Sequence, residues 1–319
     1  MNSEKKNLLL TGSGFVIFLM ILLFIVEKTI SLFVQNSNHD QTGKINRIME
    51  HIIDPEILII GSSVAEVGFN SIHLSETCNQ QVYNLAIDGT PINETEFLID
   101  EFLSYTEKCN KIIIGINFFS FSEKKGLTMP SRYLAHLSNS NVKNSLERND
   151  PVLFNKLEYV PFYSFIQVDH SYYKNAVLGV FESKLEVDSL SGFVPHDASY
   201  TGEISKNNFY TEEISFSKKK IQSQQRIINK IKAKGIEPIL VITPIFENGR
   251  NLFNNYSDFV KTAESLSLQT GIEFFNFSDS KISQDKKYFY NNGHLNRTGA
   301  NEFTKQIADS LSCRMKYIP

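Results

Sequence analysis

Five short apolar runs divide the chain at regular intervals. They are rich in Ile and Val and lie at residues 56–61, 81–87, 111–117, 238–245 and 272–277. Each run is continuous rather than alternating with polar residues, which is typical of strands that are covered on both faces of a sheet. The pattern therefore predicts five buried strands.

Helical periodicity occupies the intervals between these runs. One helix is expected within residues 90–109, with Thr90 as its N-cap and Pro91 at its first position. Two more are expected at residues 217–235, ending at Gly235, and at Arg297 to Ser312. Their inward faces are formed by Ile92, Ile99, Phe102 and Leu103, by Ile221, Ile228 and Ile231, and by Ala300, Phe303, Ile307 and Leu311. Alternating strands and helices predict an α/β fold, a doubly wound, flavodoxin-like, five-stranded parallel sheet in three α/β/α layers.

A long insertion interrupts this alternation after the third strand. It covers residues 121–216, far more than an ordinary connection, and contains aromatic pieces such as "YVPFYSF" and "SGFVPHDASY". Insertions at the binding edge of an α/β sheet usually shape a substrate site or a partner surface, and a lid without a specific ligand is the alternative.

The N-terminus predicts a membrane anchor. Residues Leu8 to Val26 are uncharged and about long enough to cross a bilayer. A cleavable signal peptide is the alternative, but no small-residue cleavage site follows, so we expect an uncleaved anchor. Lys5 and Lys6 precede the helix against Lys28 after it, which places the N-terminus in the cytoplasm and the rest outside. The expected division is residues 1–34 as cytoplasmic tip and anchor, 35–53 as tether, and 54–319 as the α/β domain.

Composition narrows the functional classes. The 319 residues carry a net charge of −3 with scattered basic residues, which gives no electrostatic case for nucleic acid. The seven histidines and three cysteines show no metal-ligand spacing, so we expect neither a zinc site nor a cofactor. Cys78 and Cys109 each precede an expected strand, where either a disulfide between them or two buried thiols would fit.

Candidate chemistry gathers where the expected strands end. Ligands of open parallel sheets bind beyond the carboxyl ends of the strands. There the sequence places Ser63, Gly89, Asn117 and His294. Together they fit acyl transfer, with Ser63 as nucleophile, His294 as base, and the N–H groups of Ser63 and Gly89 plus the Asn117 amide as an oxyanion hole. Taken singly, each would be an ordinary turn or capping residue.

These segments resemble the blocks of the SGNH/GDSL hydrolase superfamily over roughly residues 54–120 and 235–312. "IIGSSVAEVGFN" is similar to the first block, with Ser62 in place of the usual aspartate before the Ser63 nucleophile. "NLAIDGT", "GIN" and "NNGHLNRTGA" resemble the blocks that supply the oxyanion glycine, the oxyanion asparagine and the histidine. The resemblance implies the same roles for Gly89, Asn117 and His294.

The triad acid departs from the family's pattern, because its position falls at Asn291, and Asn292 has no carboxylate either. In a serine-protease triad, the aspartate-to-asparagine change costs about 10⁴ in turnover by favouring the wrong histidine tautomer. Two alternatives stay open. Asn291 accepts the Nδ1 proton through its amide oxygen, or a carboxylate such as Asp279 or Asp285 reaches the ring.

The anchor directs the choice among the activities of the superfamily. An anchored domain with a large insertion resembles bacterial envelope polysaccharide O-acyltransferase proteins, which implies a cell-envelope glycan as acceptor and a multi-spanning membrane-bound O-acyltransferase as partner. The alternatives are an anchored carbohydrate esterase or deacetylase, and a non-catalytic glycan-binding pseudoenzyme given Asn291. The pairs His196–Asp197 and Asp169–His170 in the insertion are interpreted as solvated loop residues rather than glycan contacts.

Overall fold

A computed structural model describes residues 3–122, 127–182, 185–186, 188–202 and 212–311. Contacts divide the chain into two compact units. One, called the α/β unit below, comprises Arg47–Thr128 and Glu186–Pro319; the other, the helical unit, comprises Met1–Asn46 and Met129–Leu185. The expected insertion therefore contributes to both units.

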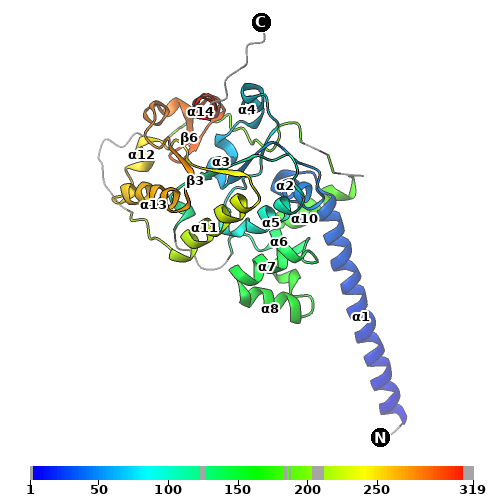
Figure 1. The fold of residues 1–319 in the computed structure, drawn as a ribbon. Coiled ribbons are helices and arrows are strands. Elements are labelled where there is room, and N and C mark those ends of the chain that lie inside the picture. Colours follow the sequence, from blue (N-terminus) through cyan, green and yellow to red (C-terminus); the bar gives the residue numbers. More distant parts are fainter. Residues whose placement is uncertain (1–2, 123–126, 183–184, 187, 203–211, 312–319) are drawn as a thin grey trace. The chain divides into compact units, whose positions relative to one another are not determined.

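The α/β unit contains the predicted five-stranded parallel sheet (Figure 1). Its order is β2-β1-β3-β4-β5, with all neighbouring pairs parallel, which confirms the flavodoxin-like fold class. The strands are β1 (Ile57–Gly61), β2 (Val82–Asn84), β3 (Lys111–Ile116), β4 (Glu237–Ile242) and β5 (Glu273–Asn276). β2 is shorter than residues 81–87, although the Leu85 and Ile87 N–H groups still bond to Ile59 and Gly61. β5 is an edge strand with half-buried phenylalanines, so the expectation that both of its faces are covered is wrong.

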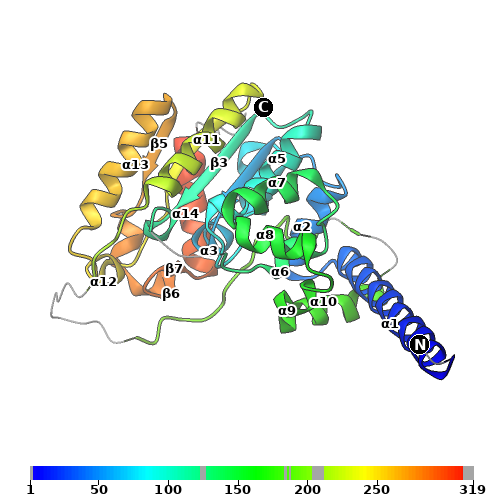
Figure 2. The same ribbon diagram turned by 90° about the horizontal axis from the view of Figure 1, so that it is seen from below.

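Helices cover both faces of this sheet (Figure 2). α3 (Ser63–Gly68), α4 (Ser71–Cys78) and α14 (Arg297–Ser310) form a core with alternate strand residues such as Ile57, Ile59 and Ile113. α5 (Glu96–Tyr105), α11 (Lys218–Ala233) and α13 (Tyr256–Thr270) form the other layer. The shorter elements are η1 (Ile92–Glu94), η2 (Phe118–Ser120), α12 (Glu247–Arg250), η3 (Lys281–Gln284), η4 (Lys286–Tyr288), β6 (Phe289–Asn291) and β7 (His294–Leu295).

Helix boundaries differ from the sequence expectation at two places. The helix expected from Thr90 begins instead at Glu96 with Thr95 as N-cap, after the short turn η1. The Thr90 hydroxyl donates to the Asp88 carbonyl, so it does not cap a helix. α14 ends at Ser310, and Ser312 lies outside the described residues. The expected inward faces are otherwise buried, with Leu103, Ile221 and Leu311 only half-buried.

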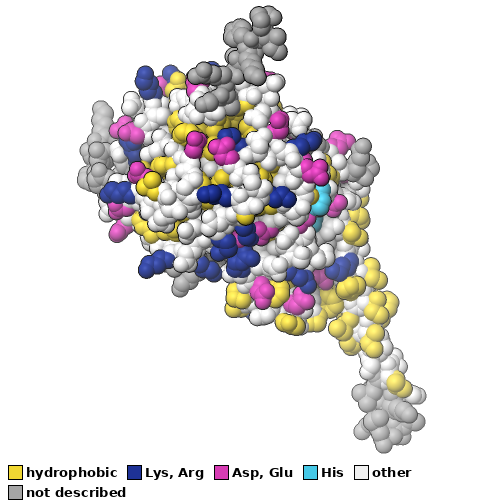
Figure 3. Space-filling view, viewed as in Figure 1, with side chains coloured by type: hydrophobic (Ala, Val, Ile, Leu, Met, Phe, Trp, Pro, Cys, Tyr) yellow, Lys and Arg dark blue, Asp and Glu magenta, His cyan; other side chains and the backbone are white. Residues whose placement is uncertain are grey.

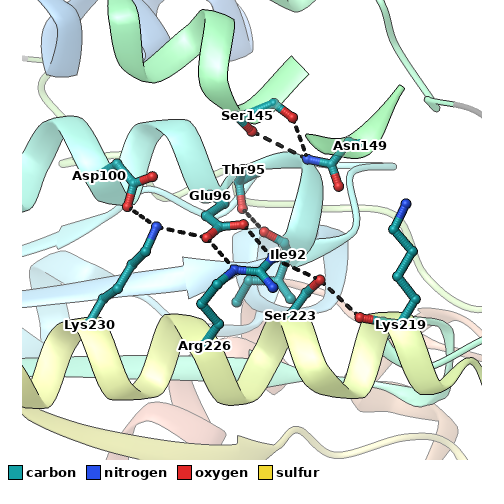
Figure 4. Close-up of polar contacts among 10 residues, drawn as sticks. All are labelled: Ile92, Thr95, Glu96, Asp100, Ser145, Asn149, Lys219, Ser223, Arg226 and Lys230. Atoms are coloured by element: carbon teal, nitrogen blue, oxygen red, sulfur yellow. Dashed lines mark hydrogen bonds and ion pairs between the residues drawn. The ribbon is translucent and has the colours of Figure 1, made fainter. Parts of the chain in front are cut away.

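A buried carboxylate joins α5 to α11 (Figure 4). The side chain of Glu96 is fully buried, and Arg226 contacts both of its oxygens at 2.9 and 2.8 Å. Lys230 donates to Glu96 at 2.8 Å and to Asp100 at 2.5 Å. Two cations on one helix thus satisfy a charge that would be costly to bury alone.

The helical unit is built around the N-terminal helix α1 (Ser3–Asn36). The insertion adds α6 (Ser131–Leu134), α7 (Ser140–Asn149), α8 (Pro151–Tyr159), α9 (Ser164–Gln167) and α10 (His170–Val180). α10 packs along the last turns of α1, where Gly179 lets the helices meet, because an added Cβ would lie 1.8 Å from the Phe33 carbonyl oxygen. Asp169 is the N-cap of α10 and also accepts from Ser131 and Ser171, so it has a structural role rather than a solvated one.

Two further expectations from the sequence meet a different structure. Residues 35–53, expected as a tether, include α2 (Asp40–Met49), in which Ile45 and Ile48 are buried. The thiol of Cys109 is free, so the disulfide between Cys78 and Cys109 is not formed. Burial raises the pKa of Cys109 to about 11, which keeps it an inert thiol.

Candidate active site

Ser63 is placed by a close approach of the first helix to the sheet. It is the first residue of α3, directly after β1. Gly61 and Gly115 are register partners on β1 and β3, and a Cβ on either would lie within 3 Å of the Ala65 side chain. Gly61 also has a φ of +151°, which favours glycine. The paired glycines therefore let α3 sit on the switch point between β1 and β3, where such folds bind ligands.

Asn84, which was not among the residues expected at the site, fixes the other end of α3. Its fully buried amide donates to the carbonyls of Ala65, Glu66 and Phe69 at 2.9, 3.2 and 3.0 Å. Its oxygen accepts the Ala86 N–H. Carbonyls at a helix end need such donors, and this amide supplies them for the helix that carries Ser63. In the sequence, its role is indicated only by the position of a single asparagine within the apolar run 81–87.

A hairpin brings His294 to Ser63. β6 and β7 are antiparallel, and Asn291 pairs with His294 across the turn Asn292–Gly293. His294 Nε2 lies 2.8 Å from Ser63 Oγ. His294 Nδ1 lies 2.9 Å from Asn291 Oδ1, which also accepts the Gly293 N–H at 2.9 Å. Ser63, His294 and Asn291 thus form one continuous line of contacts.

The Gly293 contact determines which histidine nitrogen carries the proton. A backbone N–H can only donate, so the Asn291 atom that meets both Gly293 and His294 is the amide oxygen. That oxygen can only accept, so Nδ1 is protonated and Nε2 is free to accept the Ser63 hydroxyl proton. The geometry therefore selects the tautomer that a general base needs, which is the first of the two alternatives left open by the sequence.

The other candidate acids are engaged elsewhere. Asp279 forms an ion pair with Arg250 at 2.6 Å. Asp285 caps η4 and pairs with Lys287 at 2.9 Å. Asn292 has a structural contact, because its side-chain oxygen accepts the Tyr200 hydroxyl at 2.5 Å. The Ser62 hydroxyl is buried and has no hydrogen-bond partner among the described residues, and it does not cap α3.

His294 is electrostatically suited to be neutral. Burial lowers the pKa of His294 below its ordinary value, the Asp88 carboxylate opposes this by raising it, and His196 lowers it further. With a pKa below about 6.5, the ring is uncharged at neutral pH. Asp88 is the carboxylate that favours the protonated ring, and it precedes Gly89 in the chain.

Gly89 and Asn117 follow β2 and β3, the two neighbours of β1, so they lie at the same edge of the sheet as Ser63. Gly89 is exposed with a φ of +63°. The Asn117 side-chain oxygen accepts the backbone N–H of Ser120 in a capping box. Because its oxygen is occupied in this way, the NH₂ end of the Asn117 amide is the end left for another partner.

The end of the insertion crosses the hairpin. The segment Ser191–Tyr200, called the strap below, begins beside β2, where the Ser191 carbonyl accepts the Asn84 N–H at 2.8 Å. His196 stacks on Tyr290 with ring centroids 4.1 Å apart, and Tyr290 stacks on His294 at 5.5 Å. Asp197 pairs with Arg297 through two bonds of 2.5 and 2.9 Å. His196 and Asp197 are both exposed loop residues, as the sequence indicated, and each has a side-chain partner, Tyr290 for His196 and Arg297 for Asp197.

Among the residues that the structure describes, no group of three or more His, Cys, Asp or Glu side chains could hold a metal ion. The assembled groups are a hydroxyl, an imidazole and neutral amides. Groups of these types can act in nucleophilic and acid–base catalysis.

No family model and no curated protein matches the chain. Several solved structures are similar to it. One, provisionally described as a platelet activating factor from Streptococcus pneumonia, is 15% identical with a TM-score of 0.44 and 94% and 99% of the two chains covered. Another, provisionally described as a lipolytic protein of the G-D-S-L family from Desulfitobacterium hafniense DCB-2, is 11% identical with a TM-score of 0.39. The match covers 79% of this chain and 97% of the other. A family two carbohydrate esterase from Clostridium thermocellum, in complex with cellohexaose, is 9% identical with a TM-score of 0.37. The match covers 82% of this chain and 66% of the other. Likenesses this distant assign no residue role.

Proposed function

We propose that this chain is an enzyme of the SGNH/GDSL type in which Ser63 carries an acyl group as an ester. The observation that supports this most directly is the line of contacts from Ser63 Oγ to His294 Nε2 at 2.8 Å and from His294 Nδ1 to Asn291 Oδ1 at 2.9 Å. A hydroxyl becomes nucleophilic when a positioned base takes its proton, and a neutral imidazole with a free Nε2 is such a base.

In the first step, Ser63 Oγ attacks the carbonyl carbon of an acyl donor while its proton passes to His294 Nε2. The charge that develops on the carbonyl oxygen is stabilised by the N–H groups of Ser63 and Gly89 and by the Asn117 amide. The intermediate then collapses, and the donor's alcohol leaves with the proton from Nε2. Attack by an acceptor hydroxyl on the Ser63 ester repeats the steps, with His294 removing the acceptor's proton.

Asn291 orients the ring but adds no charge. Its oxygen holds the Nδ1 proton and so avoids the wrong tautomer that an asparagine can impose at this position. It stabilises the imidazolium less than a carboxylate would. We therefore expect a working enzyme with a lower turnover than a triad with a carboxylate.

We further propose that the chain is anchored in a membrane. α1 contains the one helix segment among the described residues, Leu10–Asn36, that is long and apolar enough to cross a membrane. α1 stays helical from the apolar run through Asn36, where a cleaved signal peptide would need a short extended region with small residues. This favours an uncleaved single-pass anchor in the cytoplasmic membrane. By the charge difference between Lys5, Lys6 and Lys28, the N-terminus would be inside and the catalytic domain outside.

For an enzyme outside the membrane, we propose acyl transfer, with acetyl as the simplest group, to a hydroxyl of a cell-envelope glycan. The stacked rings of His196 and Tyr290 beside His294 offer a flat wall for such an acceptor. A multi-spanning membrane-bound O-acyltransferase would deliver the acyl group across the membrane. These assignments come from the resemblance and from the anchor.

The test compares two neighbouring serines. Ser63→Ala should reduce acylation of the glycan by roughly 10⁴-fold or more, because the nucleophile is lost. Ser62→Ala is the matched control, since the Ser62 hydroxyl has no hydrogen-bond partner within the described part of the chain, and it should retain activity. Both variants should accumulate in the membrane like the parent chain. Unchanged glycan acylation in Ser63→Ala would refute the proposal.

Two measurements separate the alternatives. Rapid release of acid from p-nitrophenyl acetate, without stimulation by a sugar acceptor, would identify an esterase or deacetylase instead of a transferase. A fluorophosphonate probe should label the parent chain and not Ser63→Ala. If the parent chain takes no label, the non-catalytic glycan-binding alternative is correct.

A further inference from the structure

The corner between α8 and α9 exposes several large apolar side chains. Tyr159 at the end of α8 is 75% exposed, and Ile166 in α9 is 71% exposed. Val160 and Pro161 between them are also exposed. This corner, residues Tyr159–Ile166, contains the "YVPFYSF" piece that the catalytic proposal does not use. Exposed apolar clusters of this kind usually mark a contact surface.

The corner is attached to α1 at the point where its apolar run ends. The Ser164 hydroxyl donates to the carboxylate of Glu27, the first charged residue after Val26. The contacts of α10 with α1 lie further toward the C-terminus of α1, where Tyr172 bonds to Ser31 and Asn175 bonds to Ser37. The helical unit therefore starts at the corner and continues along α1 away from its apolar part.

The views of the structure agree with this placement. In Figure 1, α8 lies at the edge of the helical unit toward which the apolar part of α1 projects. Figure 2, seen from that side, shows α8 and α9 in front. In Figure 3, hydrophobic side chains continue from α1 onto this edge of the unit.

The composition of the corner matches the boundary between lipid headgroups and acyl chains. Tyrosines are enriched at that depth, where an apolar ring and a polar hydroxyl are both solvated. Lys156 lies over the ring of Tyr163, 5.3 Å from its centroid, with a flexible stem that can keep its ammonium group in the headgroup layer. The other exposed members, Val160, Pro161 and Ile166, carry no charge.

We propose that the corner Tyr159–Ile166 inserts into the interface of the leaflet in which α1 ends, as a second membrane contact beside the anchor. The occupant is phospholipid, because the corner is continuous with the proposed spanning helix at its last uncharged turn. The inference rests on the proposed anchoring of α1. Its role would be to restrict tilting of the helical unit about the end of α1.

The chain contains no tryptophan, so a single introduced indole reports on one position. Full-length Tyr159→Trp and Ile166→Trp would be reconstituted in phosphatidylethanolamine–phosphatidylglycerol vesicles with and without brominated acyl chains. Bromine near the headgroup end should quench both by at least twofold. Phe181→Trp is the matched control, because Phe181 is 84% exposed in the same unit but next to Glu182, which bonds to the Asn38 N–H beyond the end of α1. It should show little quenching.

Leu22→Trp, on an exposed position of the apolar run, separates this inference from the anchoring itself. Quenching at position 22 without quenching at 159 and 166 would overturn the lipid contact and leave the anchor intact. Crosslinking of those two positions to a membrane protein in cells would then assign the corner to a protein partner. Lack of quenching at position 22 would refute the anchoring as well.

Discussion

Two positions in the α/β unit treat negative charge in opposite ways. On α5, the carboxylate of Glu96 is fully buried and is held by Arg226 and Lys230. In the hairpin, the residue that faces His294 Nδ1 is the uncharged Asn291, although this position is exposed and a carboxylate there would not need to be desolvated. A buried charge thus joins α5 to α11, whereas His294 is oriented by the uncharged amide of Asn291.

A triad acid normally makes two contributions together, and in this chain they come from different groups. One is orientation of the ring and choice of tautomer, which Asn291 and the Gly293 N–H supply through one oxygen. The other is stabilisation of the imidazolium, which the Asp88 carboxylate favours by raising the pKa of His294. At Glu96, charge and geometry cannot be separated, because the contacts that position the carboxylate also neutralise it.

Removal of a cation from Glu96 should have the largest effect. Arg226→Ala removes the two contacts of 2.9 and 2.8 Å between the guanidinium and the buried carboxylate, and we expect a loss of about 3 kcal/mol in the free energy of unfolding, the lower end for a broken buried pair. Urea denaturation in detergent, followed by circular dichroism, measures it. Lys261→Ala, which removes an exposed pair with Asp258, is the control and should change stability by less than about 0.5 kcal/mol. Equal effects of the two changes would contradict the assigned role of Glu96.

Removal of the amide at position 291 should have the second largest effect in free energy. Asn291→Ala deletes one hydrogen bond to a ring that becomes charged during the reaction, which is worth about 1.5–3 kcal/mol, or roughly a 10- to 100-fold lower kcat. Thermal stability should hardly change, since the side chain is exposed. Steady-state kinetics with an activated acetyl ester measures the loss. A kcat equal to that of the parent would mean that water orients the ring equally well.

Restoring the charge should move the pH profile. In the parent chain, kcat/KM should rise with pH through the pKa of His294, which lies below about 6.5, and be level at neutral pH because the base must be unprotonated. Asn291→Asp places a carboxylate beside Nδ1 and favours the protonated ring, so the pKa of His294 rises and the acidic limb moves to higher pH. A pH–rate profile of both proteins shows the shift. An unmoved limb would exclude His294 as the titrating base.

Loss of the stacked wall should have the smallest effect. His196→Ala uncovers Tyr290, and we expect KM for a sugar acceptor to rise roughly two- to tenfold, the size of one aromatic contact, with little change in kcat. Asp197→Ala keeps the wall and serves as control. Competition between acceptor sugars at fixed acyl donor gives the values. A change in kcat alone would place His196 in the chemistry rather than in acceptor binding.

The sequence was sufficient for those features that follow from strand ends. Continuous runs of Ile and Val predicted the five strands and their parallel order, and the carboxyl ends of parallel strands meet at one edge, so Ser63 and the residues after β2 and β3 were expected together. His294 was expected there because it follows the fifth strand, although it reaches the site on a hairpin that was not predicted. The Asn292–Gly293 dipeptide, a common hairpin turn, was the signal for it.

Other features depend on contacts that no local pattern specifies. The orientation of the Asn291 amide is set by the Gly293 N–H, and the same sequence with the amide reversed would favour the other tautomer. Asn84 bonds to α3 from the neighbouring strand β2, and the strap reaches the hairpin from more than ninety residues away. The helical unit combines the N-terminus with residues 129–185, a long-range pairing that periodicity cannot reveal.

One consequence of α1 concerns mechanics. The helix runs without interruption from its apolar run into the segment that packs against α10, and Gly179 brings the two backbones into direct contact. There is consequently no flexible joint between the apolar part of α1 and the helices that pack on its C-terminal part. Inserting or deleting one residue in the apolar part of α1 would rotate the helices packed on its C-terminal part by about 100° about the axis of α1. The length of α1 therefore sets the direction in which the helical unit faces.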